Sequence, residues 1–397
     1  MSSPRTADVV VIGGGVAGLS TARALTDLGI RDVVVVERHT IGSGGTGKSS
    51  GIVRCHYGIP SLAAMAWRAL PVLEKADEIL GAPSGYRRTG YLVGVGTENL
   101  GALRANVAMH QHLGIDVELV SHDTARELWP WARLEDFAEF AYEPRGGYGD
   151  GHQTALAFAA AARRGGASLH QHCAVAGLEV TGGRVRGVRL LDGGRISAAH
   201  VVLAAGPWSA ELAADVAIDL PVKAQRAQIL LVHPGRDLGP IPVFSDLVSL
   251  QYVRSEGTSS LLLGDSDHSR PEWSDPDHYR ERISDEELAM AIPKFDHRFP
   301  GLDGASLSSS YAGCYDVTPD YNPVISPSPV EGLWLCVGFS GHGYKISPSV
   351  GELMADLIVE GSSRHPDIDH RDFRWERFDE EDLLVSPHPY VGAGQMR

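Results

Sequence analysis

The sequence predicts a protein of the α/β class with two domains, one built on a parallel sheet and the other an α+β domain built on an antiparallel sheet. Three observations carry this prediction. The chain has 397 residues and 43% of them are hydrophobic, which is too long for one ordinary domain and enough to fill two cores. It opens with a strand–helix–strand pattern. Its later part alternates loops with short β-like runs, such as those at 229–232 and 260–263.

The opening pattern is a βαβ unit. Residues 8–12 are a continuous apolar run, typical of a strand that is covered on both faces. Residues 16–28 predict a helix, and Gly29 is placed to end it. A second buried strand follows at 33–36. Such a unit begins a parallel sheet of the Rossmann type.

Three glycines lie between the first strand and the helix, in the pattern Gly13-x-Gly15-x-x-Gly18. Glycines there permit a tight turn and let the backbone approach a pyrophosphate, which then lies at the positive end of the helix. Glu37 ends the second strand, at the usual place for a carboxylate that accepts from ribose hydroxyls. These residues predict a dinucleotide site, and a glycine turn that serves only packing is the alternative.

Two later segments favour FAD over NAD. Residues 200–208 form a buried strand that ends in Ala204-Ala-Gly206. Two-domain flavoproteins resembling glutathione reductase place such a segment beside the flavin, where a side chain would clash. A strand at 333–337 runs into a glycine-rich loop at 338–343 and then a helix, whose N–H groups can stabilise negative charge on a reduced flavin. The first domain is therefore predicted to be a glutathione-reductase-like FAD-binding domain.

Three further motifs lie far apart in the chain. They are Gly51-Ile-Val-Arg-Cys-His-Tyr-Gly58, Tyr315-Asp-Val-Thr-Pro-Asp320 and Gly338-Phe-Ser-Gly-His-Gly-Tyr-Lys-Ile-Ser347. In this order they resemble the motifs of the sarcosine oxidase family, with its β subunits and glycine oxidases, in the D-amino-acid oxidase class of flavoproteins. The resemblance implies an FAD-dependent oxidoreductase that oxidises the C–N bond of an amino acid or N-alkyl amino acid.

The glycine loops and the resemblance together predict the residues around FAD. They are Gly13, Gly15, Val16, Ala17, Gly18, Glu37, Arg38, Gly45, Thr46, Lys48, Ser49, Ser50, Val175, Ala205, Gly206, Trp208, Gly313, Gly338, Gly341, His342, Gly343, Tyr344 and Lys345. In sarcosine oxidases a cysteine attaches the flavin, but the matching position here is Gly313, and Cys314 comes one residue later. Because successive strand residues point to opposite faces, FAD is expected to be noncovalent.

Lys345 breaks a local rule. It stands just before a helix predicted at 348–359, with Ser347 as the N-cap and Pro348 in the first turn. A cation is disfavoured at that positive end, and positions that break a rule are often functional. A lysine whose ammonium group simply reaches water is the alternative.

The resemblance assigns Lys345 and Arg54 to the substrate carboxylate and Tyr57 to an aromatic position nearby. A surface arginine and a core tyrosine are the alternatives for the latter two. Two cations at one spot predict a small carboxylate-bearing amine as the substrate. The implied chemistry is hydride transfer from the carbon beside nitrogen to flavin N5, giving an imine that hydrolyses, with O2 as acceptor and H2O2 as product. His342 is expected to be part of the flavin loop rather than a base.

Two alternatives stay open. In the best placement of the segment that carries the family's oxygen-activating lysine, Leu262 takes its position, so a dehydrogenase that passes electrons from an amino or hydroxy acid to another acceptor also fits. A hydroxy acid needs a base for its hydroxyl proton, and the sequence places no histidine for that task. The chain also resembles the flavin subunit of a hetero-oligomeric oxidase.

Composition argues against other classes of partner. A net charge of −15 without a basic run disfavours nucleic acid and anionic membranes. No apolar run reaches the length of a membrane span and no signal peptide is evident, so a cytoplasmic monomer or small homo-oligomer is expected. The four cysteines are widely spaced, and no metal site is predicted.

The motifs divide the chain into discontinuous domains. The FAD-binding domain is expected at 1–85, 145–218 and 325–365, the substrate domain at 86–144 and 219–324, and a charged C-terminal tail at 366–397.

Overall fold

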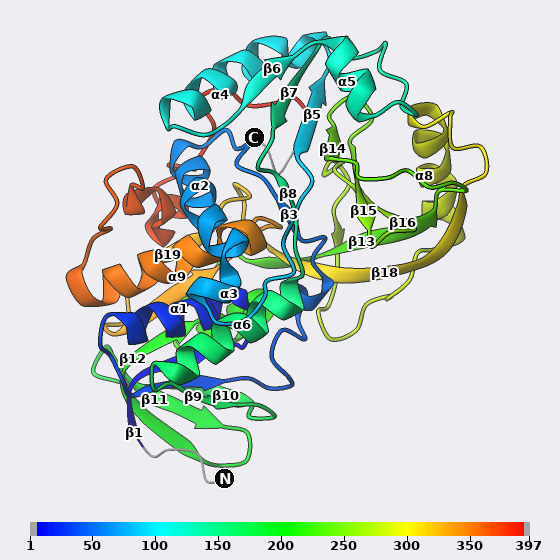
Figure 1. Cartoon of the computed structure of the whole chain (residues 1–397). Coiled ribbons are helices and arrows are strands. Elements are labelled where there is room, and N and C mark those ends of the chain that lie inside the picture. Colours follow the sequence, from blue (N-terminus) through cyan, green and yellow to red (C-terminus); the bar gives the residue numbers. More distant parts are fainter. Residues whose placement is uncertain (1–5, 393–397) are drawn as a thin grey trace.

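The computed structural model describes residues 6–392, so the first and last five residues of the expected domain ranges lie outside it. Within this range the chain forms two large sheets at opposite ends of the molecule, with a small sheet between them (Figure 1). The small sheet consists of β3 (Ile52–Val53), β8 (Gly147–Tyr148) and β4 (Arg87–Arg88). The predicted α/β class with two different sheets is confirmed.

The first sheet is mainly parallel. Its parallel strands are, in spatial order, β9 (Ser168–His170), β2 (Val33–Val36), β1 (Thr6–Ile12), β12 (Arg195–Leu203) and β20 (Leu333–Val337). Antiparallel strands extend it beside β12 and β20: β10 (Val175–Thr181), β11 (Arg184–Leu190) and β19 (Val324–Pro327). The predicted opening βαβ unit is thus confirmed and lies at the centre of this sheet.

Both faces of the parallel sheet are covered. Val9 and Val11 of β1 face a core shared with four helices, α1 (Val16–Asp27), α2 (Pro60–Glu74), α6 (Gly151–Arg164) and α9 (Gly343–Glu360). Val10 and Ile12 face a second core under β10, β11 and the short helix α7 (Ser209–Ala214). Burial on both sides explains why the opening strand has no polar alternation.

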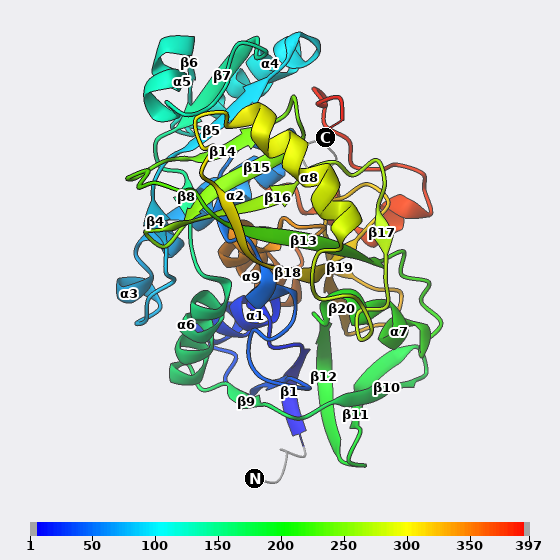
Figure 2. The same ribbon diagram turned by 90° about the vertical axis from the view of Figure 1, so that its right-hand side faces the viewer.

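The second sheet is mainly antiparallel. Its spatial order is β6 (Glu118–Val120), β7 (Glu139–Glu143), β5 (Tyr91–Val95), β14 (Val243–Asp246), β15 (Gln251–Glu256), β16 (Ser260–Asp265), β13 (Lys223–His233) and β17 (Glu272–Trp273), with β18 (Ser306–Val317) also paired to β13. Helix α8 (Asp285–Arg298) crosses one side of this sheet (Figure 2). The remaining helices are α3 (Ala76–Ile79), α4 (Leu100–His112) and α5 (His122–Leu128), with 3-10 turns η1 (Gly45–Lys48), η2 (Thr97–Asn99), η3 (Gly206–Trp208), η4 (His370–Phe373) and η5 (Trp375–Phe378).

Helix α9 corrects one prediction. It begins at Gly343 rather than at residue 348, so Ser347 is not its N-cap and Pro348 lies inside it. The proline is tolerated because the Tyr344 carbonyl, which Pro348 cannot bond, accepts from Ser347 Oγ at 2.8 Å. Lys345 therefore lies within the first turn of a long helix, and the reason to treat it as exceptional becomes stronger.

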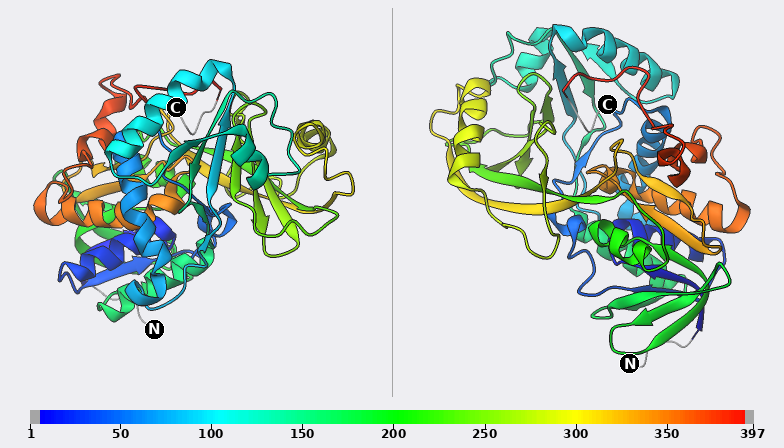
Figure 3. Two further views of the ribbon diagram at one scale, coloured as in Figure 1. Left: turned by 45° about the horizontal axis from the view of Figure 1, so that its top comes forward. Right: turned by 180° about the vertical axis from the view of Figure 1, so that it is seen from behind.

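Residues after α9 return across the molecule. Figure 3 shows this red part of the chain running from the side of α9 toward α4. The side chains of Phe373, Arg377 and Tyr390 are buried along this path. We call residues 384–392 the C-terminal segment.

Candidate active site

The first glycine loop is shaped by close backbone contacts. Gly13 has φ +115°, and a Cβ there would lie 2.3 Å from the Ala204 carbonyl oxygen at the end of β12. A Cβ on Gly18 would lie 2.2 Å from the Gly13 carbonyl oxygen. The turn therefore needs these glycines for its own packing, and their lack of side chains lets a pyrophosphate approach the backbone at the N-terminus of α1.

Thr46 and Glu37 lie at the same end of α1. Thr46 Oγ1 accepts from the Val16 N–H at 3.1 Å. The Glu37 carboxylate accepts from the N–H groups of Gly14 and His39, each at 2.8 Å. A carboxylate has about four acceptor positions, so Glu37 can still accept from a ribose. The segment that leads to Val175 runs beside it, because the Cys173 N–H donates to the Glu37 carbonyl at 2.8 Å.

Predicted FAD residues from distant parts of the chain meet along this edge. The guanidinium of Arg38 lies 4.1 Å from the centre of the Trp208 ring, just after Ala205 and Gly206. A Cβ on Gly313 would lie 2.9 Å from Lys48 Cβ, so the loop that holds Ser49 and Ser50 packs on β18. These contacts trace a continuous path from α1 to β18 that suits an extended dinucleotide.

The second glycine loop, at residues 338–343, is fixed by Asp316. Asp316 Oδ2 accepts from the Gly338 N–H at 2.7 Å, and its carbonyl accepts from the Ser340 N–H at 3.0 Å. Burial raises the pKa of Asp316 to about 6. His342 bonds the Tyr321 carbonyl through Nε2 at 3.0 Å, and burial, followed by Lys345 and Arg54, lowers the pKa of its ring well below the usual value. A neutral His342 thus holds the loop at the start of α9.

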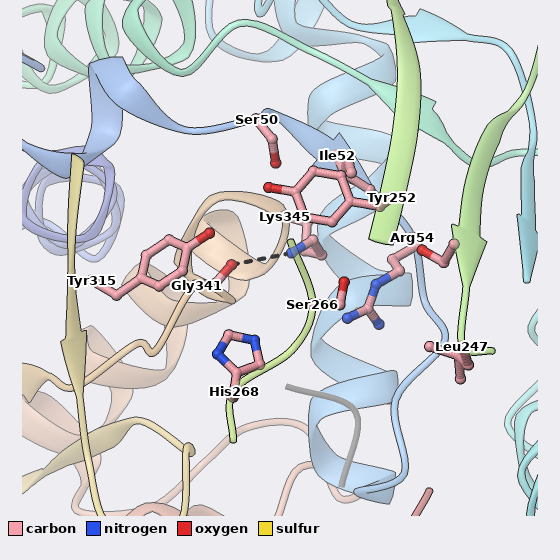
Figure 4. A pocket seen from close by; sticks show the side chains of 11 residues that line it. Ser50, Ile52, Arg54, Leu247, Tyr252, Ser266, His268, Tyr315, Gly341 and Lys345 are labelled. Atoms are coloured by element: carbon pink, nitrogen blue, oxygen red, sulfur yellow. Dashed lines mark hydrogen bonds between the residues drawn. The ribbon is translucent and has the colours of Figure 1, made fainter. Parts of the chain in front are cut away.

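A pocket lies between the two sheets where this loop meets β15 and β18 (Figure 4). It is lined by Ser50, Ile52, Arg54, Ser245, Leu247, Tyr252, Ser266, His268, Tyr315, Gly341 and Lys345. Both predicted cations are brought here, Arg54 from the loop after β3 and Lys345 from the first turn of α9. Tyr57 lies behind them rather than in the lining, with its ring 4.4 Å from the Arg54 guanidinium.

The two cations are buried without an acidic partner. Arg54 is 6% exposed and Lys345 is 7% exposed. Among residues 6–392 no carboxylate lies within ion-pair distance of either; Arg54 donates to the His56 carbonyl, and Lys345 Nζ to the Gly341 carbonyl at 3.4 Å. Burial, and then the charge of Arg54, lowers the pKa of Lys345 well below its usual value. Such uncompensated charge is costly unless an anion binds there.

His268 is the pocket residue that the sequence did not reveal. It follows β16 in an irregular stretch with no periodicity, and Gln225 Nε2 lies 3.4 Å from its Nδ1. The sequence placed no histidine in the pocket, whereas the structure puts His268 in its lining. The sequence alone carries no local signal for His268, because the pairing of strands from distant segments brings this loop residue to the site.

Two other predictions concern residues beside the pocket. Leu262, at the position expected for the family's oxygen-activating lysine, is buried in the hydrophobic core, and its strand pairs it with Leu231. An apolar side chain therefore takes the place of that cation. Burial raises the pKa of the Cys314 thiol to about 11, which disfavours the thiolate needed for attachment to a flavin.

A larger cavity of about 590 Å³ adjoins the pocket. The two share Tyr252, His268 and Tyr315 as walls. Its other walls come mainly from β13, β16 and α8 and mix apolar side chains such as Leu263 and Met290 with paired charges.

In the part of the chain that the structure describes, no helix is long and apolar enough to cross a membrane. The same residues contain no group of three or more side chains arranged to hold a metal ion.

Fold and site together define a flavoprotein of the two-domain, glutathione-reductase-like class. Residues 8–357 match the family model described as DAO, FAD dependent oxidoreductase, so the chain belongs to this family and is an FAD-dependent oxidoreductase. It is 27% identical to the sarcosine oxidase subunit beta of Arthrobacter sp over 95% of this chain and 92% of that protein.

Solved structures show the same architecture. L-proline dehydrogenase from P. horikoshii superposes with a TM-score of 0.87 at 25% identity, covering 96% of this chain and 100% of that one. Glycine oxidase from Geobacillus kaustophilus has a TM-score of 0.79 at 24% identity, covering 94% and 99%.

Proposed function

We propose that the protein oxidises the C–N bond of an amino acid or N-alkyl amino acid. The observation that carries the proposal is the pair of buried cations, Arg54 and Lys345, which face one pocket without an acidic partner. The matched relatives, a sarcosine oxidase subunit and an L-proline dehydrogenase, have names that fit this class of substrate.

Different groups in the pocket contact different parts of the substrate. Arg54 and Lys345 bind the substrate carboxylate, which fixes the carbon beside nitrogen at one place. The Gly341 carbonyl, which lines the same pocket, accepts from the substrate nitrogen. FAD, when bound, supplies the hydride acceptor. Tyr252 and Tyr315 exclude water from the reacting carbon, and substituents of the substrate extend into the larger cavity behind them.

A panel of amino acids and N-methyl amino acids, mixed with the enzyme without oxygen, tests the proposal. We expect bleaching of the flavin band by members that carry both a carboxylate and an amine. Matched hydroxy acids and the corresponding amines without a carboxylate serve as controls. Bleaching by hydroxy acids alone, or by amines regardless of the carboxylate, would contradict the proposal.

A hydroxy-acid dehydrogenase is the second candidate, and His268 is the observation that favours it. For an amine that enters neutral, His268→Asn is expected to lower kcat by less than about tenfold, because loss of a required general base costs about 10²–10⁴-fold. Steady-state kinetics of the variant measure this, with the exposed His278→Asn as the control. A loss in the larger range would favour the hydroxy-acid reaction.

We propose that FAD is held noncovalently. Gly313 cannot form a thioether, and the raised pKa of Cys314 disfavours the thiolate that would attack the flavin. After acid precipitation the yellow colour is expected in the supernatant. A yellow pellet would show a covalent link.

We further propose O2 as the electron acceptor. Stopped-flow mixing of the reduced enzyme with air-saturated buffer tests it, and slow reoxidation would instead favour a dehydrogenase, in line with Leu262 in the core. The likeness to a subunit beta also favours a hetero-oligomeric alternative, which gel filtration and the flavin content per chain distinguish. The cytoplasmic location stays a prediction from the sequence.

A further inference from the structure

We propose that Tyr390 and His56 are positioning residues that hold Arg54 in the geometry that binds the substrate carboxylate. The C-terminal segment, more than three hundred residues away in sequence, would then be part of the substrate site. The inference rests on the proposed function, because it assigns Arg54 to a carboxylate.

Arg54 depends on its own loop for its position. We call residues 54–58 the arginine loop. The guanidinium donates to the carbonyl of His56 within this loop, and no carboxylate among the described residues pairs with it. Its flat face lies 4.4 Å from the ring centre of Tyr57, in the same loop. Any shift in the backbone of the arginine loop therefore moves the guanidinium directly.

The C-terminal segment bonds the arginine loop twice. The hydroxyl of Tyr390 lies 2.7 Å from His56 Nε2, and the two rings stack with centres 5.8 Å apart. Ser386 Oγ donates to the Gly58 carbonyl at 3.1 Å. His56 and Tyr390 are both almost fully buried, so water does not compete for their bond.

Other elements hold the same loop from the second sheet. Glu143 on β7 accepts from the Cys55 N–H through Oε2 at 2.7 Å, and its Oε1 lies 3.8 Å from His56 Nδ1. His110 on α4 bonds the Tyr57 carbonyl at 2.7 Å. Burial, followed by His110 and Arg54, lowers the pKa of His56 well below its usual value. A neutral His56 with its proton on Nδ1, toward Glu143, can accept at Nε2 from the Tyr390 hydroxyl.

The C-terminal segment is itself anchored away from the arginine loop. The Val391 N–H donates to Asn99 Oδ1 at 2.8 Å, and Asn106 Nδ2 donates to the His388 carbonyl at 3.1 Å. Tyr390 lies between these two anchors. These backbone anchors remain when the Tyr390 hydroxyl is removed, and Tyr390→Phe removes only the contacts of that hydroxyl, with His56 and with Asn106.

The test compares Tyr390→Phe with the FAD-loaded wild-type enzyme. The readouts are KM for the amine and the dissociation constant of propanoate, a carboxylate without an amine, from the shift of the flavin spectrum. Both constants are expected to rise about tenfold while kcat changes little, because a buried bond is lost and its partner is left unpaired. Tyr86→Phe is the matched control: its hydroxyl donates to the Arg145 carbonyl at 2.6 Å, outside the pocket.

The outcomes separate the two proposals. If Tyr390→Phe binds propanoate as the wild type does, the inference fails whatever the change in Tm, and a larger loss of Tm than in the control shows that Tyr390 is merely structural. If the wild type does not bind propanoate at all, the proposed function fails first. Should Tyr390→Phe not retain FAD, Ser386→Ala removes the bond to Gly58, together with the 3.0 Å bond that Ser386 Oγ accepts from the His388 N–H, and is expected to raise the same two constants by a smaller factor. Unchanged constants would overturn the inference.

Discussion

Lys345→Met is expected to weaken binding of the carboxylate-bearing substrate about a hundredfold while FAD stays bound, since removing one member of a buried charge pair costs on the order of 2–5 kcal/mol. Methionine keeps the length of the side chain in the first turn of α9. KM and the dissociation constant of propanoate measure the effect, and Arg54→Ala should act in the same direction.

Lys345→Met should weaken binding without lowering the stability of the protein. Lys345 is buried beside Arg54 without an acidic partner, so its removal relieves repulsion and is expected to leave Tm unchanged or higher. Lys294→Met is the matched control, because that lysine forms a partly exposed ion pair with Asp265 at 3.2 Å. A fall in Tm together with unchanged binding constants would show that Lys345 is structural.

Propanoate is expected to bind more weakly as pH rises. Burial and Arg54 lower the pKa of Lys345 in the free enzyme, whereas a bound carboxylate stabilises the ammonium and raises that pKa. The anion therefore binds the protonated form more tightly. Affinity is expected to decline as pH rises through the pKa of the free enzyme, and Lys345→Met should abolish this decline.

Local patterns in the sequence predicted the parts of the site that depend on neighbouring residues. The βαβ unit, the glycine turn at Gly13 and the loop before Lys345 follow from periodicity and backbone needs within short segments. Arg54 came from a motif resemblance, and the structure brings it into one pocket with Lys345. Features that depend on distant pairing were missed, because no local signal encodes them.

His268 and the start of α9 illustrate the two kinds of miss. His268 reaches the pocket only because β16 pairs with β13 and β15, which lie on other parts of the chain. The start of α9 was misplaced because Ser347 and Pro348 match the rule for a helix N-terminus. The bond from Ser347 to the Tyr344 carbonyl, which compensates for the proline, is visible only in three dimensions.

Arg377 carries the second large prediction, and it concerns the stretch expected to be a charged tail. Arg377 and Asp320 have side chains that are 0% and 1% exposed, and they pair at 2.7 and 3.0 Å. Arg377 also donates to the carbonyls of Arg374 and Asn322, each at 2.8 Å. Arg377→Ala is expected to lower the free energy of unfolding by about 3–5 kcal/mol, because it leaves the Asp320 carboxylate buried without its cation.

Denaturant unfolding measures this loss, and Arg371→Ala is the control. Arg371 pairs with Asp369 on the surface, where the side chains are 75% and 42% exposed, so its removal should change stability by less than about 1 kcal/mol. If both variants lose the same free energy of unfolding, the buried pair is no more stabilising than the surface pair. Asp320 lies beside Tyr321, whose carbonyl bonds His342 of the flavin loop. Loss of Arg377 is therefore expected to loosen FAD as well, which links the end of the chain to the cofactor as Tyr390 links it to the substrate.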